Sequence, residues 1–252
     1  MGVFLLIAQL TMSSTQWVVI DPGHGGEQDG AVGVCGVKEK DAVLAISKKT
    51  AALINQTGTI KAKLTRTSDF DIPLVERPEM ANRLGAALFV SIHANSSPSP
   101  KSHGVETFFL SRNASDKHAQ ALAERENGHH HHHIQPSGDA LSQILGQLQH
   151  QKNHQSSQKF AIQLQGTLAK SLGARNRGVL QAPFMVLKST KMPAILVEVG
   201  FLTHPEECPK LGQKEHLDNI AQGLAKGIIL EVQRQKLKPQ ARAQINRGST
   251  QP

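Results

Sequence analysis

The stretch Val18–Gly26 constrains the fold of this chain more than any other. It reads Val-Val-Ile-Asp-Pro-Gly-His-Gly-Gly, an apolar run typical of a buried strand followed by residues that favour a tight loop. His24 lies in that loop, between two glycines. Open α/β folds keep their ligands and catalysts at the carboxyl edge of the sheet, so this position suits a functional side chain. Taken alone, His24 is more simply interpreted as an exposed loop histidine.

Apolar runs alternate with amphipathic stretches along most of the chain. This alternation predicts an α/β fold, a single domain with a mostly parallel central sheet flanked by helices on both faces. We expect strands at 16–21, 59–65, 87–93, 104–110 and 194–199, and helices at 38–56, 72–84, 117–127, 158–172 and 216–235.

The 252 residues fit one large domain with appendages. Residues 1–15 contain an apolar run without the positive start of a secretory signal, so they are either a weak or truncated signal or a linker remnant. The main domain is expected at 16–235, followed by a basic flexible tail at 236–252. Residues 111–158 are expected to be an insertion, a polar low-complexity segment with a short helix near 141–148. Its five consecutive histidines, His129–His133, either bind metal or are solvated.

The formal net charge of +8 suggests an anionic partner, which could be nucleic acid, acidic lipid or an acidic polymer such as cell wall. Nucleic acid is disfavoured because aromatic residues do not alternate with the basic ones. No apolar run is long enough to predict a transmembrane helix. Two cysteines, Cys35 and Cys208, make neither a zinc motif nor a disulfide framework; they are unpaired thiols or one disulfide.

Three further residues whose side chains can bind metal or transfer protons lie at the ends of predicted strands and helices. His93 ends one buried strand, Glu198 lies near the end of another, and Glu39 begins the helix after the first loop. Glu39 could simply complement the helix dipole. Two imidazoles and one carboxylate also form a catalytic zinc set, and bound zinc lowers the pKa of water toward ~7 and polarises a carbonyl. A second carboxylate would then take the proton from this water and pass it to the leaving group. This set of residues therefore predicts zinc-dependent hydrolysis of an amide or ester.

Six short motifs, spread over about residues 16–232, identify a family when they occur together in this order. The chain carries Val-Val-Ile-Asp-Pro-Gly-His-Gly-Gly (18–26), Lys-Glu-Lys-Asp (38–41), Leu-Thr-Arg (64–66), Ser-Ile-His-Ala-Asn (91–95), Gly-Val-Glu-Thr-Phe-Phe (104–109) and Val-Glu-Val-Gly-Phe-Leu-Thr (197–203). It therefore resembles the zinc-dependent N-acetylmuramoyl-L-alanine amidases, a family that includes the cell-division amidases of Gram-negative bacteria.

The resemblance implies a role for each matching residue. His24, Glu39 and His93 would ligate one zinc ion, Glu198 would be the catalytic carboxylate, and Asn95 would help to hold substrate. The implied reaction cleaves the amide between N-acetylmuramic acid and L-alanine in peptidoglycan, in cell-wall remodelling or daughter-cell separation. A periplasmic or secreted location follows from that substrate. The alternative is a catalytically idle, zinc-containing cell-wall-binding module, which would have no need of Glu198.

The insertion resembles the regulatory helix of division amidases, which covers the site until a protein activator binds. Residues 122–127 look like its start, and we expect Glu124 or Glu126 to occupy the open position of the zinc in the resting enzyme. Both could instead be ordinary surface carboxylates. Deleting residues 117–155 should then raise the basal activity. The histidine run departs from the family pattern here.

Four other residues have less specific expectations. Arg66 and Arg77 are expected to form salt bridges or to steer substrate, and His118 to lie at the surface. Glu106 could support a ligand histidine, because metal-bound imidazoles usually need such a partner.

Overall fold

The computed structural model describes the backbone of residues 15–128 and 140–248, and the side chains of 15–128 and 153–237. The predicted N-terminal segment and His129–His133 therefore lie outside the described residues, apart from residue 15. No described helix is long and apolar enough to cross a membrane.

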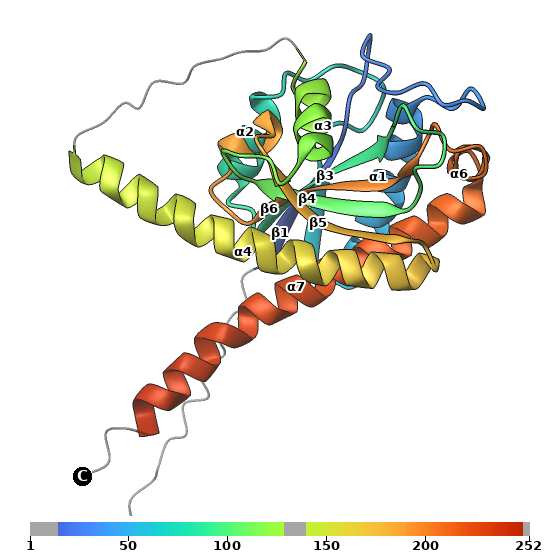
Figure 1. The fold of residues 1–252 in the computed structure, drawn as a ribbon. Helices are drawn as coiled ribbons and strands as arrows, with labels where there is room; N and C mark the ends of the chain where they lie inside the picture. The colour runs from blue at the N-terminus through green and yellow to red at the C-terminus, as the bar shows by residue number, and fades with distance from the viewer. Residues whose placement is uncertain (1–14, 129–139, 249–252) are drawn as a thin grey trace, which may run out of the picture.

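One sheet of six strands, in the order β2-β1-β3-β6-β4-β5, forms the centre of the described chain (Figure 1). The first four strands in that order are mutually parallel, β4 runs antiparallel to β6, and β5 runs parallel to β4. The predicted mostly parallel α/β sheet is thus confirmed. The strand bounds are β1 Gln16–Pro22, β2 Ile60–Leu64, β3 Leu88–Asn95, β4 Val105–Leu110, β5 Asn176–Ala182 and β6 Ala194–Phe201.

Helices cover both faces of the sheet, as the sequence predicts. Alternate residues of β1 divide between two apolar cores: Val18 and Ile20 pack on the side of α1, α4 and α7, and Val19 packs on the side of α2, α3 and α5. Figure 1 shows α4 and α7 crossing beneath the sheet and α3 standing on its other side. The helix bounds are α1 Glu39–Gln56, α2 Glu76–Leu84, α3 Lys117–Asn127, α4 Ala140–Leu172, α5 Met185–Lys188, α6 Glu207–Leu211 and α7 Lys214–Gly248.

Two helices are longer than the sequence analysis expects. α4 is continuous from Ala140, where a short helix at 141–148 and a separate helix at 158–172 were expected. The polar residues between them include neither proline nor a glycine close to the junction, so nothing interrupts the backbone hydrogen bonds. α7 continues to Gly248, past the expected end at 235, so residues 236–248 are helical.

β5 and α6 were not expected at all. β5 is an edge strand whose residues are mostly half-buried, so it lacks the continuous apolar run that marks the central strands. α6 is only five residues long. It carries Cys208, which forms a disulfide with Cys35 in the loop between β1 and α1. The structure thereby resolves the alternatives for the two cysteines in favour of a single disulfide.

Candidate metal centre and active site

His24 follows the end of β1 in a backbone conformation that side chains rarely adopt. Its φ is +58°, in the left-handed region that favours glycine. A buried arginine from α2 holds this turn: Arg77 donates from Nη2 to the carbonyl of His24 (2.9 Å) and from Nη1 to the carbonyl of Pro22 (2.9 Å). The same Nη1 lies 3.1 Å from Oδ1 of the buried Asp21. Arg77 thus combines the expected salt bridge with a contact that fixes the position of His24.

A second buried arginine, Arg66, binds the same loop through backbone carbonyls. It donates to Gly23 at 2.6 Å, to Pro22 at 3.1 Å and to Lys40 at 3.0 Å. Gly23 itself lies against a functional side chain, since a Cβ there would come within 2.4 Å of the ring of His93. The glycine is therefore required for the close approach of the β1 loop to β3.

Glu39, the first residue of α1, turns both carboxylate oxygens into the site. Oε2 accepts a hydrogen bond from the backbone N–H of Ala31 (2.8 Å), and Oε1 accepts one from that of Ala94 (3.0 Å). Oε1 also lies 3.1 Å from Nε2 of His24 and 3.0 Å from Nδ1 of His93. The loop between β1 and α1, the end of β3 and the start of α1 are thereby joined at one buried carboxylate.

Glu198 lies beside His93 because the two residues are register partners on the neighbouring parallel strands β6 and β3. Its side chain is fully buried, and neither carboxylate oxygen has a hydrogen-bond partner among the described residues. Burial raises the pKa of Glu198 well above its usual range. An unpartnered buried carboxyl group is costly, so its retention here points to a chemical role.

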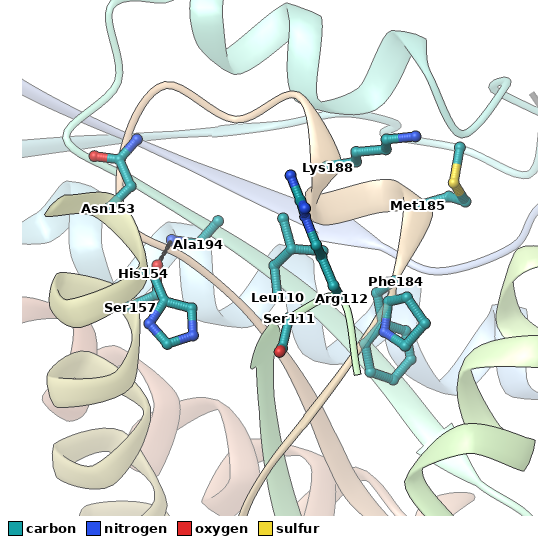
Figure 2. Close-up of a pocket in the computed structure, with 11 residues that line it drawn as sticks. Leu110, Ser111, Arg112, Asn153, His154, Ser157, Phe184, Met185, Lys188 and Ala194 are labelled. Carbon is teal, nitrogen blue, oxygen red and sulfur yellow. Dashed lines mark hydrogen bonds between the residues drawn. The ribbon is translucent and has the colours of Figure 1, made fainter. Parts of the chain in front are cut away.

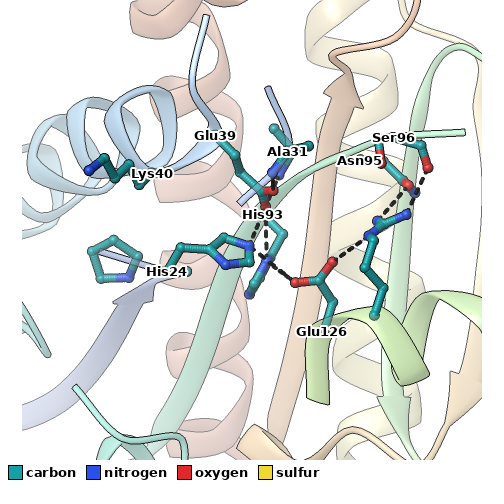
Figure 3. Close-up of polar contacts among 12 residues, drawn as sticks. His24, Ala31, Glu39, Lys40, His93, Asn95, Ser96 and Glu126 are labelled. Atoms are coloured by element: carbon teal, nitrogen blue, oxygen red, sulfur yellow. Dashed lines mark hydrogen bonds and ion pairs between the residues drawn. The ribbon is translucent and has the colours of Figure 1, made fainter. Parts of the chain in front are cut away.

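Glu126, near the end of α3, completes a cluster of four side chains (Figure 3). Its Oε2 lies 3.1 Å from Nε2 of His24 and 3.1 Å from Nδ1 of His93. The candidate ligand atoms of His24, Glu39, His93 and Glu126 all lie within 4.8 Å of one another. Glu124 does not join them: it is exposed and accepts a hydrogen bond from Gln120.

The cluster has the chemistry of a metal site. Nε2 of His24 and Oε2 of Glu126 are buried and lie close together, yet neither has a hydrogen-bond partner, as expected for two groups that converge on a cation. Burial would lower the pKa of His24, but the carboxylates of Glu39 and Glu126 outweigh it and raise this pKa to about 9. For Glu39, burial is outweighed by the facing histidines, which lower its pKa to about 2. Two imidazoles and two carboxylates fit a zinc ion.

Asn95 and Glu106 form a second buried polar group beside the cluster. Nδ2 of Asn95 donates to Oε1 of Glu106 (2.6 Å), which also lies 2.7 Å from Nε2 of His118. Nε of Arg177 donates to the other oxygen of Glu106 (2.8 Å). The expectation that Glu106 supports a ligand histidine is therefore wrong, since its partners are Asn95, His118 and Arg177. His118 is likewise half-buried rather than a plain surface residue.

Arg125 is the site residue that the sequence analysis did not single out. It donates from Nε to Oε1 of Glu126 (3.0 Å), from Nη1 to the carbonyl of Ser96 (2.9 Å) and from Nη2 to Oδ1 of Asn95 (3.2 Å). Its only signal in the sequence is its place next to Glu126, which does not distinguish it from an ordinary surface arginine.

A cavity of about 760 Å³ lies apart from the cluster, between α4, α5 and the start of β6 (Figure 2). Leu110, Phe184 and Ala194 contribute apolar surface, and Arg112 and Lys188 are the cationic side chains among its lining. None of the four cluster residues lines it, so the candidate chemistry belongs to the cluster and not to this cavity.

Comparison with known proteins assigns the family. The family described as N-acetylmuramoyl-L-alanine amidase (Amidase_3) matches residues 18–230, which include every residue of the cluster. This chain belongs to that amidase family. Both the predicted family and the predicted enzyme class are confirmed, and the chain is a peptidoglycan amidase.

Individual relatives agree with this assignment. The chain is 40% identical over 220 residues to the N-acetylmuramoyl-L-alanine amidase AmiA of Salmonella typhimurium, covering 86% of this chain and 76% of the relative. It is also 40% identical over 216 residues to AmiA of Escherichia coli, covering 84% and 74%. Among solved structures, the amidase AmiC2 of Nostoc punctiforme matches with a TM-score of 0.67 and 33% identity, covering 86% of this chain and 97% of that one.

Proposed function

We propose that this amidase hydrolyses the bond between the lactyl carbonyl of N-acetylmuramic acid and L-alanine, with one zinc ion held by His24, Glu39 and His93. The observation that supports this most directly is the convergence of four candidate ligand atoms within 4.8 Å, two of which, Nε2 of His24 and Oε2 of Glu126, are buried without a hydrogen-bond partner. Glu198 lies beside them on the adjacent strand. Zinc bound there would polarise the scissile carbonyl and lower the pKa of water.

Glu198 is the residue that we assign to proton transfer. It is buried next to His93, and its raised pKa suits a group that takes a proton from the attacking water and then passes it to the leaving nitrogen of L-alanine. Asn95 is assigned to substrate binding because it is buried beside the cluster and faces α3. The arginines that hold the His24 loop keep the first ligand in place.

We also propose that the resting enzyme is autoinhibited by α3. A catalytic zinc site needs an open position, and the carboxylate of Glu126, 3.1 Å from His24 and 3.1 Å from His93, would fill it as a fourth ligand. α3 is anchored at both ends: His118 contacts Glu106, and the side-chain amide of Asn127 bonds the carbonyl of Pro183 (2.9 Å) and the N–H of Met185 (2.8 Å). Substrate could then enter only after α3 moves.

An activator protein that displaces α3 would fit this arrangement. A structural neighbour, the CwlD amidase from Clostridioides difficile, was solved in complex with the GerS lipoprotein and matches with a TM-score of 0.66 and 25% identity. That complex shows that an amidase of this fold binds a protein partner. It supports, by analogy, a protein activator for the present chain.

A periplasmic or secreted location is also part of the proposal, with a role in cell-wall remodelling or daughter-cell separation. Peptidoglycan lies outside the inner membrane, and the Cys35–Cys208 disulfide fits an oxidising compartment.

The chemistry is tested by digesting purified peptidoglycan with two zinc-loaded variants, Glu126→Ala and Glu126→Ala/Glu198→Gln. The first variant removes the proposed fourth ligand, and the second also removes the proton carrier while keeping its size. We expect the single variant to release peptides with free L-alanine amino termini, identified by mass spectrometry, and the double variant to be slower by about 10²–10⁴-fold. Equal rates would refute the role of Glu198. Binding to peptidoglycan without any release would instead indicate an idle cell-wall-binding module.

A further inference from the structure

Arg125 donates hydrogen bonds to two oxygens that receive no other hydrogen bond from α3. The carbonyl of Ser96 and Oδ1 of Asn95 receive its two terminal nitrogens at 2.9 and 3.2 Å, at the carboxyl end of β3. The side chain of Arg125 is 39% exposed, whereas that of Asn95 is fully buried. When α3 moves away, these two oxygens lose their donor and face the opened site.

The orientation of Asn95 is fixed independently of α3. Its Nδ2 donates to Glu106 at 2.6 Å, and Glu106 is held on its other oxygen by Arg177. The amide of Asn95 therefore cannot rotate to offer its N–H groups to the site without breaking that bond. Its Oδ1 remains aimed at the place that Arg125 now fills, so the subsite is built to accept a hydrogen bond and not to donate one.

We infer that Ser96 and Asn95 form a substrate subsite that accepts the backbone N–H following L-alanine, and that Arg125 mimics this donor in the resting enzyme. The inference rests on the proposed amidase function and on the proposed displacement of α3. It assigns to α3 a second inhibitory contact with the site, beside that of the Glu126 carboxylate.

The spacing along the site agrees with one peptide residue. Nε of Arg125 lies 3.0 Å from Oε1 of Glu126, while its terminal nitrogens reach Ser96 and Asn95. A substrate N–H must take the place of these terminal nitrogens, which lie one guanidinium width beyond Nε, and Nε is itself one hydrogen bond from the carboxylate at the centre. One residue of extended peptide spans ~3.3–3.6 Å, so the N–H that follows L-alanine is the donor at a distance of this order from the scissile bond.

A neutral amide donor can satisfy the two acceptors of the subsite. Both acceptors are uncharged carbonyl oxygens. The nearby carboxylate of Glu106 is already paired with Arg177 and contacts His118. A peptide N–H can therefore bind there without leaving an unpaired buried charge.

The test compares a soluble muropeptide with its depsipeptide analogue, in which an ester oxygen replaces the N–H after L-alanine. The enzyme is the zinc-loaded Arg125→Ala/Glu126→Ala variant, which removes both α3 contacts with the site and keeps the buried Leu122 that packs α3 into the core. We expect kcat/KM to be lower for the analogue by about 3- to 10-fold, the effect of one lost hydrogen bond.

The matched control adds Asn95→Ala to the same variant. The readout is the kcat/KM for the muropeptide divided by the kcat/KM for the analogue, so a general loss of activity caused by Asn95→Ala cancels. We expect this ratio to fall toward one. A ratio of one before Asn95 is changed, or an unchanged ratio afterwards, would overturn the subsite. Failure to cleave even the amide muropeptide would overturn the proposed function itself, so the two failures are distinguishable.

Discussion

The protonation of His24 links the candidate metal site to pH. Burial alone would lower its pKa, but Glu39 and Glu126 lie close enough to outweigh burial and raise it to about 9. The metal-free protein therefore carries a protonated His24 at pH 7. The stabilisation from this pairing is complete below the ordinary pKa of 6.5 and is lost as pH rises through about 9. A metal ion binds the neutral imidazole, so it competes with that proton.

Zinc binding at pH 7 should accordingly release at least one proton. The measurement is isothermal titration calorimetry of the metal-free protein in buffers of different ionisation enthalpy. We expect the observed enthalpy to depend on the buffer at pH 7, and the number of released protons to decrease as pH rises through about 9. An enthalpy that is independent of the buffer at pH 7 would contradict a protonated His24.

His24, Glu39, His93 and Glu198 each lie at the end of an element that the sequence pattern predicts, and the structure brings the four together. The two buried arginines carry no such signal. Arg66 and Arg77 are buried against backbone carbonyls that converge only in the folded loop. No local sequence pattern encodes those partners.

At the scale of elements, α3 is a structural helix to which we also assign the proposed regulatory role. It buries Ala119, Leu122 and Ala123 in the core on one side of the sheet and carries Arg125 and Glu126 into the site. Deletion of residues 117–155 would therefore expose the core and cut α4 as well as remove the proposed inhibition. Single substitutions at the site end of α3 separate the two effects.

α3 has the bounds expected from the sequence, Lys117–Asn127. In the structure, Asp116 is its N-cap and accepts a hydrogen bond from the N–H of Ala119, and Gly128 ends the helix. The sequence does not distinguish between Glu124 and Glu126 as the residue that enters the site. The two lie on different sides of the same helix, and only the packing of Leu122 against the sheet determines which side faces the site.

For the whole molecule, the disulfide joins two distant segments. Cys35 lies in the loop between β1 and α1, and Cys208 lies in α6, 173 residues further along the chain. The loop that carries Cys35 also contains Ala31, whose N–H binds Glu39. A cross-link over so long a separation restricts the unfolded chain strongly.

Removing the disulfide should lower the free energy of unfolding by about 3 kcal/mol. The measurement is equilibrium urea denaturation of the metal-free Cys35→Ala/Cys208→Ala variant against the oxidised wild type. Reduced wild type serves as the control for the two substitutions, and it should match the variant. Equal midpoints for the variant and the oxidised protein would show that the disulfide contributes nothing to stability.

The most direct test of the closed resting site is the rate of peptidoglycan hydrolysis by the zinc-loaded wild type, Glu126→Ala and Glu124→Ala, without any activator. Glu124 is the matched control, because it is a carboxylate on the same helix that lies outside the cluster. We predict that Glu126→Ala raises the basal rate by ~10-fold or more, equivalent to about 1.4 kcal/mol, and that Glu124→Ala leaves it unchanged. Equal rates for all three proteins, or activation by Glu124→Ala alone, would contradict a site closed by Glu126.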